Sequence, residues 1–309
     1  MTTLFLSHPA SLLHDTTPGH PERPDRIRAI TRALGEDRFA SLLRRTAEPA
    51  PLEAVALAHP REWVDAIVAA SPERGFVQVD ADTLMSPGTL DAALTGVGSA
   101  LAAIDAVMSG EVANAFSATR PPGHHAERTR AMGFCIFNTA AIAARHAQTR
   151  HGAERVVIVD WDVHHGNGTQ DILWDDPSVL YASTHQAPLY PGTGATSERG
   201  DHDTIVNVPL AAGTDGPRFR EAFTTRILPR LEAFRPDLVV VSAGFDAHWR
   251  DPLANLRLNE ADFAWATTAL MEVADRHAGG RLVSVLEGGY DLQGLSSSVA
   301  EHVATLMVA

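Results

Sequence analysis

The chain has 309 residues, of which 45% are hydrophobic and 20% are charged, and its formal net charge is −13. This balance is typical of a globular protein with a large core and excludes a mainly disordered chain. The acidic charge argues against direct binding to nucleic acid. We expect no transmembrane helix, because the chain has no sufficiently long apolar run, and no signal peptide. The single cysteine, Cys135, excludes an internal disulfide and favours a reducing, cytoplasmic location.

Apolar runs and helical patterns alternate along the chain, without a linker or an internal repeat. Runs such as 156–159 and 238–241 are continuously apolar, which is typical of strands buried on both faces of a parallel sheet. The alternation predicts a doubly wound α/β domain. The predicted strands are Thr3–Ser7, Val55–Ala58, Ala113–Ala118, Arg155–Val159, Val179–Ser183, Ile205–Pro209, Leu238–Ser242 and Leu282–Leu286. The predicted helices include Pro24–Leu34, Pro60–Ala70, Pro87–Met108, Asn138–His151, Pro217–Phe234 and Glu260–His277.

Polar side chains follow four of these predicted strands directly. The loops 119–125, 160–168, 243–248 and 287–291 each contain glycine together with His, Asp or Tyr. The carboxyl ends of parallel strands meet at one edge of a sheet, where open α/β proteins bind ligands. We therefore expect these four loops to form one functional site.

Asp162 and His164 are candidate metal ligands, because residues two apart on an extended segment point to the same face. Asp246 can join them from another strand end. Two carboxylates and one imidazole leave a coordination position for water, which is the arrangement of a catalytic zinc site. Asp160 shares this face, and the spacing leaves open whether it is a ligand or supports one. We interpret the neighbouring His165 as structural.

His124 and His125 form an adjacent pair at a strand end, after two prolines and a glycine. Such a pair differs in pKa, because one charged imidazole disfavours charge on the other. One ring can then act as general base and acid while its neighbour supplies positive charge. Tyr290 follows two glycines, and its phenol is a candidate donor to a developing oxyanion.

Taken together, these motifs resemble the zinc-dependent histone deacetylase family, from about His20 to Leu292 and in the family's motif order. Asn167, where many eukaryotic members carry Asp, is similar to the class II and bacterial branches. The resemblance implies the arginase–deacetylase fold as a single catalytic domain over residues 1–309, with about eight mostly parallel strands between helices. The segments that carry it are His20–Pro24, Arg120–His125, Gly133–Cys135, Asp160–Gln170, Ser242–Asp246 and Leu286–Tyr290.

The resemblance also implies a role for each site residue. His125 matches the general base and acid, held by Asn167, and His124 matches an electrostatic histidine paired with Asp160. Tyr290 matches the phenol that polarises the scissile carbonyl. One zinc ion per chain is implied, and the positions that match its ligands are Asp162, His164 and Asp246.

Further residues match a narrow substrate tunnel and a second ion. Gly133 and Phe134 match one tunnel wall, and Tyr190 matches the aromatic residue that faces it. The resemblance implies a structural potassium ion behind the zinc. Its ligands come from Asp160, Asp162, His164, Ser183 and Thr184.

The implied activity is removal of acetyl or another short acyl group from acyl-lysine side chains or from small acylated amines. Leu253 follows Asp251 and Pro252 and offers no charge for a polyamine, which favours acyl-lysine as substrate. Asp82 in the short segment 71–88 is either a contact for a peptide backbone or a solvated acid. Three alternatives are an acetylpolyamine amidohydrolase, an arginase-like binuclear manganese hydrolase and a non-catalytic acyl-lysine-binding scaffold. The preferred acyl group, the choice between zinc and iron, and homo-oligomer formation are not decided by the sequence.

Overall fold

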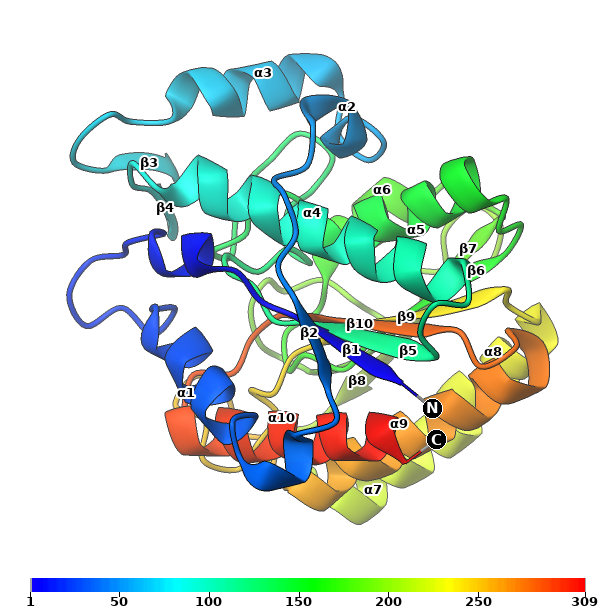
Figure 1. Ribbon diagram of the computed structural model, residues 1–309. Coiled ribbons are helices and arrows are strands. Elements are labelled where there is room, and N and C mark those ends of the chain that lie inside the picture. Colours follow the sequence, from blue (N-terminus) through cyan, green and yellow to red (C-terminus); the bar gives the residue numbers. More distant parts are fainter. Residues whose placement is uncertain (1, 309) are drawn as a thin grey trace.

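The computed structural model describes residues 2–308, which form an eight-stranded sheet between two layers of helices (Figure 1). The strand order is β2-β1-β5-β10-β9-β6-β7-β8, and every neighbouring pair is parallel. A separate antiparallel hairpin joins β3 to β4. The strands are β1 (Thr3–Leu6), β2 (Leu43–Arg45), β3 (Val77–Asp80), β4 (Thr83–Met85), β5 (Asn114–Ser117), β6 (Val156–Asp160), β7 (Val179–Gln186), β8 (Ile205–Leu210), β9 (Leu238–Ala243) and β10 (Leu282–Leu286).

Helices cover both faces of the sheet, because parallel strands need long crossover connections. One layer contains α2 (Leu52–Val55), α3 (Arg61–Ala70), α4 (Thr89–Met108), α5 (Thr139–His151) and α6 (Asn167–Leu173). The opposite layer contains α1 (Asp25–Ala33), α7 (Gly216–Ala222), α8 (Leu228–Phe234), α9 (Glu260–His277) and α10 (Leu292–Met307). The short helices are η1 (Pro9–Leu12), η2 (Asp37–Phe39) and the π-helical η3 (Phe223–Ile227), which joins α7 to α8.

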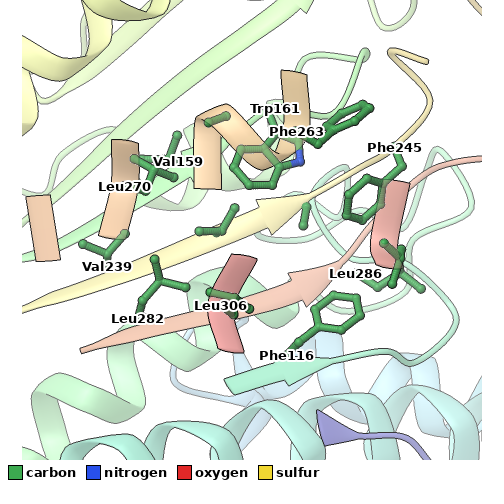
Figure 2. Close-up of a cluster of buried hydrophobic side chains, with 14 of the residues drawn as sticks. Phe116, Val159, Trp161, Val239, Phe245, Phe263, Leu270, Leu282, Leu286 and Leu306 are labelled. Carbon is green, nitrogen blue, oxygen red and sulfur yellow. The ribbon is translucent and has the colours of Figure 1, made fainter. Parts of the chain in front are cut away.

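Large aromatic side chains anchor two of the site loops to the core between the sheet and α9 (Figure 2). Trp161 follows β6 directly, and its ring centre lies 6.5 Å from that of Phe245, which follows β9 closely. Phe263 of α9 packs 5.1 Å from Phe245. Burying a phenylalanine side chain stabilises a fold by roughly 1.5–3 kcal/mol. This packing fixes the backbone beside the polar residues that the same two loops carry at the carboxyl edge of the sheet.

Two helix caps fix further site loops. The Asn138 side chain accepts a hydrogen bond from the Ala141 N–H at the start of α5. The Asp291 side chain accepts one from the Gly294 N–H at the start of α10, immediately after the loop that ends in Tyr290. Each cap satisfies an N–H group that has no partner within its helix.

Seven of the eight predicted strands overlap observed strands, and the eighth is wrong. Residues 55–58, predicted as a strand, form the end of α2 and the turn after it. Short apolar runs do not distinguish strand from helix, and the flanking Pro51 and Pro60 favour a brief helical turn here. The eighth strand of the sheet is instead β2, whose sequence Leu43-Arg44-Arg45 is mostly polar because it lies at an edge.

Helix α4 has the length and hydropathy of a membrane span, and it is the one such helix among residues 2–308. Of its most apolar window, 72% is buried inside the structure. It packs along α5 and against β5, so its apolar surface contacts protein. Burial of this kind is typical of the core helix of an α/β domain.

Candidate active site

The four polar loops follow four adjacent strands, because β5, β10, β9 and β6 are neighbours at the centre of the sheet. Their carboxyl ends lie at one edge, so the loops converge as predicted. The convergence brings together residues from 124 to 290 of the chain. A reactive site can therefore form here although its parts are distant in sequence.

Asp162, His164 and Asp246 meet at the centre of this edge, which confirms their predicted proximity. His164 Nδ1 lies 3.2 Å from Asp162 Oδ1 and 3.1 Å from Asp246 Oδ2. All three residues are buried. A Cβ atom at Gly244 or Gly288 would collide with these carboxylates, so both positions require glycine. The three side chains are thus held with their donor atoms directed at one point.

Backbone N–H groups orient the two carboxylates. The Gly288 N–H donates to Asp162 Oδ2 at 2.8 Å, and the Val163 N–H donates to Asp246 Oδ1 at 2.8 Å. Burial disfavours the charge of His164, but its hydrogen bonds to both carboxylates raise its pKa to about 10. Burial and the nearby Asp162 charge raise the pKa of Asp246 to about 7. The cluster therefore strongly favours positive charge at its centre, as a divalent metal site requires.

His124 and His125 lie beside the three candidate ligands with their ring centres 4.0 Å apart. His124 Nδ1 is 3.0 Å from Asp160 Oδ2, and His125 Nδ1 is 2.8 Å from Asn167 Oδ1. Although burial opposes it, the charges of Asp162 and Asp160 raise the pKa of His124 well above its ordinary value. Burial and the positive charge of His124 lower the pKa of His125 well below it. The two pKa shifts have the directions that the resemblance implies, with His124 charged and His125 neutral.

Asp160 faces the histidine pair, and no described contact brings its side chain to His164 or Asp246. Besides His124, its Oδ2 accepts a hydrogen bond from the Tyr181 hydroxyl at 3.0 Å, and its Oδ1 accepts the Asp162 N–H. Of the two interpretations that the spacing left open, these contacts favour support of His124, and Asp160 is not among the three clustered donors. Tyr181 in β7 carries no sequence signal for this role, because its run is simply apolar and aromatic.

Glu287 is a second site residue whose role the sequence did not indicate. Its Oε2 accepts the N–H groups of Gly123 and His124, at 2.7 and 3.0 Å, and its Oε1 accepts the Ser242 hydroxyl. This buried carboxylate ties the ends of β5, β9 and β10 together. The one sequence feature that could have indicated Glu287 as a site residue is its position directly after a buried strand.

Tyr290 lines the same pocket as His125 and His164. The Arg26 guanidinium stacks 5.0 Å from the centre of its ring and donates to the Gly289 carbonyl at 2.7 Å. Desolvation raises the pKa of the Tyr290 phenol well above its ordinary value, and the charge of Arg26 opposes the shift. The phenol is therefore protonated at neutral pH and able to donate. Glu22, which pairs with Arg26 at 3.0 Å and with Arg120, completes a buried network behind the ring.

A pocket of about 210 Å³ opens from these groups to the surface. Its walls are largely aromatic, with Phe134 6.1 Å from Tyr290 and Tyr190 5.1 Å from His125 between ring centres. All four predicted tunnel residues line it, and the full lining is Asp82, His125, Gly133, Phe134, His164, Leu189, Tyr190, Leu253 and Tyr290. Two larger surface hollows among residues 2–308 contain no comparable group of reactive side chains.

Two further predicted residues have clear positions. His165 forms hydrogen bonds with Thr193 Oγ1 at 2.8 Å and Gln170 Oε1 at 3.1 Å and is not among the three clustered candidate ligands, in keeping with a structural role. Asp82 accepts the Gly133 N–H at 2.9 Å, so it supports the pocket wall. Whether it also contacts a substrate backbone stays a prediction.

The residues predicted to hold a monovalent cation lie on β6, on β7 and in the loop after β6. Asp160 is the last residue of β6, and Ser183 and Thr184 lie inside β7. Asp160 stands opposite Ser183 in the β6–β7 register, and Thr184 follows. Ser183 Oγ is 2.9 Å from His185 Nδ1. The potassium ion itself stays a prediction.

A parallel sheet between helices, with a buried Asp-His-Asp cluster, a histidine pair and a phenol at its carboxyl edge, is the arrangement of a hydrolase with a candidate metal site. The family model described as "Histone deacetylase domain" matches residues 20–306. A histone deacetylase-like amidohydrolase of Pseudomonas aeruginosa is 42% identical, over 88% of this chain and 73% of that protein. Human polyamine deacetylase HDAC10 is 37% identical, over 96% of this chain and 46% of that protein.

Among solved structures, the HDA15 HD domain superposes with a TM-score of 0.94 at 37% identity, covering 99% of this chain and 90% of that one. The chain therefore belongs to the histone deacetylase family. Membership makes it a hydrolase that acts on amide bonds, and the predicted fold class is confirmed.

Proposed function

We propose that the protein is a zinc-dependent amidohydrolase that removes acetyl or another short acyl group from the side-chain amine of acyl-lysine. The observation that carries this proposal is the apposition of His125, Tyr290 and the Asp162–His164–Asp246 cluster at the inner end of one apolar-walled pocket. Such a pocket fits the alkyl chain of an acylated lysine. It places the amide bond of that side chain beside His125, Tyr290 and the three candidate metal ligands.

The donor set fits a single zinc ion, which Asp162, His164 and Asp246 would hold. When bound, the ion supplies a Lewis acid that polarises the amide carbonyl and increases the acidity of water. An arginase-like pair of metals needs additional bridging carboxylates. The described residues offer only these three donors at this position, which favours one ion.

His125 acts as general base and then as general acid. Its Nδ1–H is engaged by Asn167 Oδ1, so the Nε2 atom of the neutral ring is free to accept a proton. Nε2 takes a proton from the attacking water and later returns it to the leaving amine. The charged His124, fixed by Asp160, keeps His125 neutral and stabilises negative charge that develops nearby.

Tyr290 donates its phenolic proton in a hydrogen bond to the oxyanion of the tetrahedral intermediate. Arg26 holds the ring from behind and fixes the Gly289 carbonyl before it. The presence of the phenol and of all three candidate ligands argues against a scaffold that binds acyl-lysine without turnover.

The proposal also includes a structural potassium ion beside Asp160. The pairing of Asp160 with Ser183 in the β6–β7 register supports it.

The preference for acyl-lysine rests on the pocket mouth. Asp251 accepts the N–H groups of Leu253 and Tyr290, at 3.0 and 2.7 Å, so it fixes Leu253 beside the phenol. Leu253 presents apolar surface there, where a distal ammonium of a polyamine would need a charged partner. Acetylpolyamines are the second candidate substrates, because the Asp82 carboxylate lines the same pocket.

A substrate panel tests this proposal. We expect higher kcat/KM on acyl-lysine peptides than on acetylspermidine or acetylputrescine. Leu253→Glu should shift the ratio toward polyamines, whereas the matched Leu253→Gln, similar in size but uncharged, should not. A tenfold wild-type preference for acetylpolyamines, equivalent to about 1.4 kcal/mol, would reverse the assignment. No turnover of either class, with the metal bound, would argue for the scaffold.

A further inference from the structure

A second cluster of metal-binding side chains lies outside the active site. His146 Nε2 and His151 Nε2 of α5 are 2.8 and 2.6 Å from the same atom, Asp105 Oδ1 of α4. Across residues 2–308, this cluster and the active-site trio are the two groups of three or more His, Cys, Asp or Glu residues whose ligand atoms converge. Neither the family resemblance nor the proposed function uses it.

The cluster lies at the end of the sheet opposite the active site. Helix α4 ends at Met108, shortly before β5 begins at Asn114, and α5 ends at His151, shortly before β6 begins at Val156. Both helices therefore finish near the amino ends of strands, whereas the catalytic groups follow the carboxyl ends. The two sites can bind independently.

The donors suit a transition metal of borderline softness. Two imidazole nitrogens and one carboxylate oxygen are typical zinc ligands, whereas Mg²⁺ and Ca²⁺ prefer oxygen alone. Donor atoms of one tetrahedral zinc lie about 3.3 Å apart, given bonds of about 2.0–2.1 Å. The distances from Asp105 Oδ1 to His146 Nε2 and His151 Nε2, 2.8 and 2.6 Å, must therefore increase by roughly half an ångström or slightly more. Among residues 2–308, neither ring's Nδ1 atom has a protein partner, so Nδ1 can carry the ring hydrogen while Nε2 binds an ion.

The surroundings also favour a cation. Asp105 lies in the last turn of α4, and His151 is the last residue of α5, so both helices direct the negative ends of their dipoles here. The His146 and His151 side chains are 16% and 20% exposed, and Asp105 is 52% exposed. The rings are therefore held in place while an ion can enter from solvent.

We propose that Asp105, His146 and His151 form a second site for one divalent transition-metal ion such as Zn²⁺, which links α4 to α5 at the edge of the sheet opposite the active site. Water completes the coordination. The ion is structural: it cross-links two helices of one layer and does not take part in amide hydrolysis.

Metal stoichiometry tests the proposal. The purified enzyme, already loaded at its active site, is titrated with ZnCl₂ in competition with a chromogenic chelator, and its Tm is recorded with and without excess Zn²⁺. The variants are His146→Gln/His151→Gln and the milder Asp105→Asn. The control is His202→Gln, which removes an exposed histidine outside the cluster.

We expect wild type and His202→Gln to bind one equivalent more than the double variant and to gain thermal stability from it. Asp105→Asn should weaken that equivalent at least tenfold, and kcat/KM should be equal in all four proteins. The difference of one equivalent identifies the site whatever the occupancy of the active site. Equal zinc stoichiometry in wild type and the double variant would overturn the proposal. If the double variant does not fold, unchanged zinc affinity in Asp105→Asn would overturn it instead.

Discussion

His302 of α10 is a buried histidine whose surroundings predict acid sensitivity of the fold. It is fully buried, with Nδ1 2.7 Å from Thr267 Oγ1 and Nε2 2.9 Å from Ser284 Oγ. The rings of Phe116 and Trp161 pack edge-on, 5.4 and 5.5 Å away between centres. Thr267 Oγ1 donates to a helix carbonyl, so it accepts the Nδ1–H of a neutral ring. No carboxylate is positioned to compensate a charge.

Burial lowers the pKa of His302 to about 3, against an ordinary value of 6.5. Below pH 6.5 the unfolded chain therefore binds a proton that the folded chain excludes. The stability from this residue is fully present above pH 6.5 and is lost as the pH falls toward 3. At pH 5 the loss is about 1.36 × 1.5, or roughly 2 kcal/mol of the free energy of unfolding.

Urea unfolding at pH 8 and at pH 5 measures this quantity. His302→Gln keeps polar atoms near both hydroxyls but cannot titrate, so wild type should lose about 2 kcal/mol more than the variant between the two pH values. Other groups titrate equally in both proteins and cancel in the comparison. The exposed-residue control His202→Gln should behave as wild type. Equal losses in wild type and His302→Gln would refute the reasoning.

Two further predictions concern the active site. Tyr290→Phe should leave metal content and Tm unchanged while kcat falls roughly 10²–10³-fold, because the hydroxyl acts only when the oxyanion forms; near-normal turnover on the best substrate would remove it from the mechanism. Asp246→Ala removes a charged ligand, so zinc content and activity should fall together. Elemental analysis of the purified Asp246→Ala protein checks this, and retention of one tightly bound zinc at the active site would contradict the ligand set.

The central strands of the sheet and the clustered site residues could be predicted because both follow from patterns of neighbouring residues in the sequence. Buried parallel strands are continuous apolar runs, and polar residues directly after them must share an edge. Asp162, His164 and Asp246 were placed together by that argument alone. The edge strand β2 was missed because Leu43-Arg44-Arg45 lacks such a run, and an apolar run at 55–58 was assigned wrongly as a strand.

Supporting residues were harder to predict because their function depends on contacts between distant segments. Tyr181 reaches Asp160 across a strand pair, and Arg26 reaches Tyr290 from a helix near the amino terminus. Glu287 joins three strand ends, yet in sequence it is only an acid before two glycines. Neither spacing nor periodicity encodes such partners.

The strand order has a consequence for folding. β10 is the last strand in the chain, yet it lies between β5 and β9 in the middle of the sheet. Until β10 is inserted, the sheet consists of two halves that no strand pairing joins. These halves are β2-β1-β5 and β9-β6-β7-β8. Pairings between such distant segments form slowly, because long loops must close before contacts repay the lost entropy.

The same insertion brings in Glu287, which ties the strand ends together, and Tyr290, the proposed oxyanion donor. During synthesis the earlier strands leave the ribosome first, with an unfilled gap in the sheet and exposed apolar edges. If Tyr290 acts as proposed, we expect amide hydrolysis to begin only after almost the whole chain has folded. A chain of this architecture that is catalytically active is therefore one in which β10 has already been inserted into the sheet.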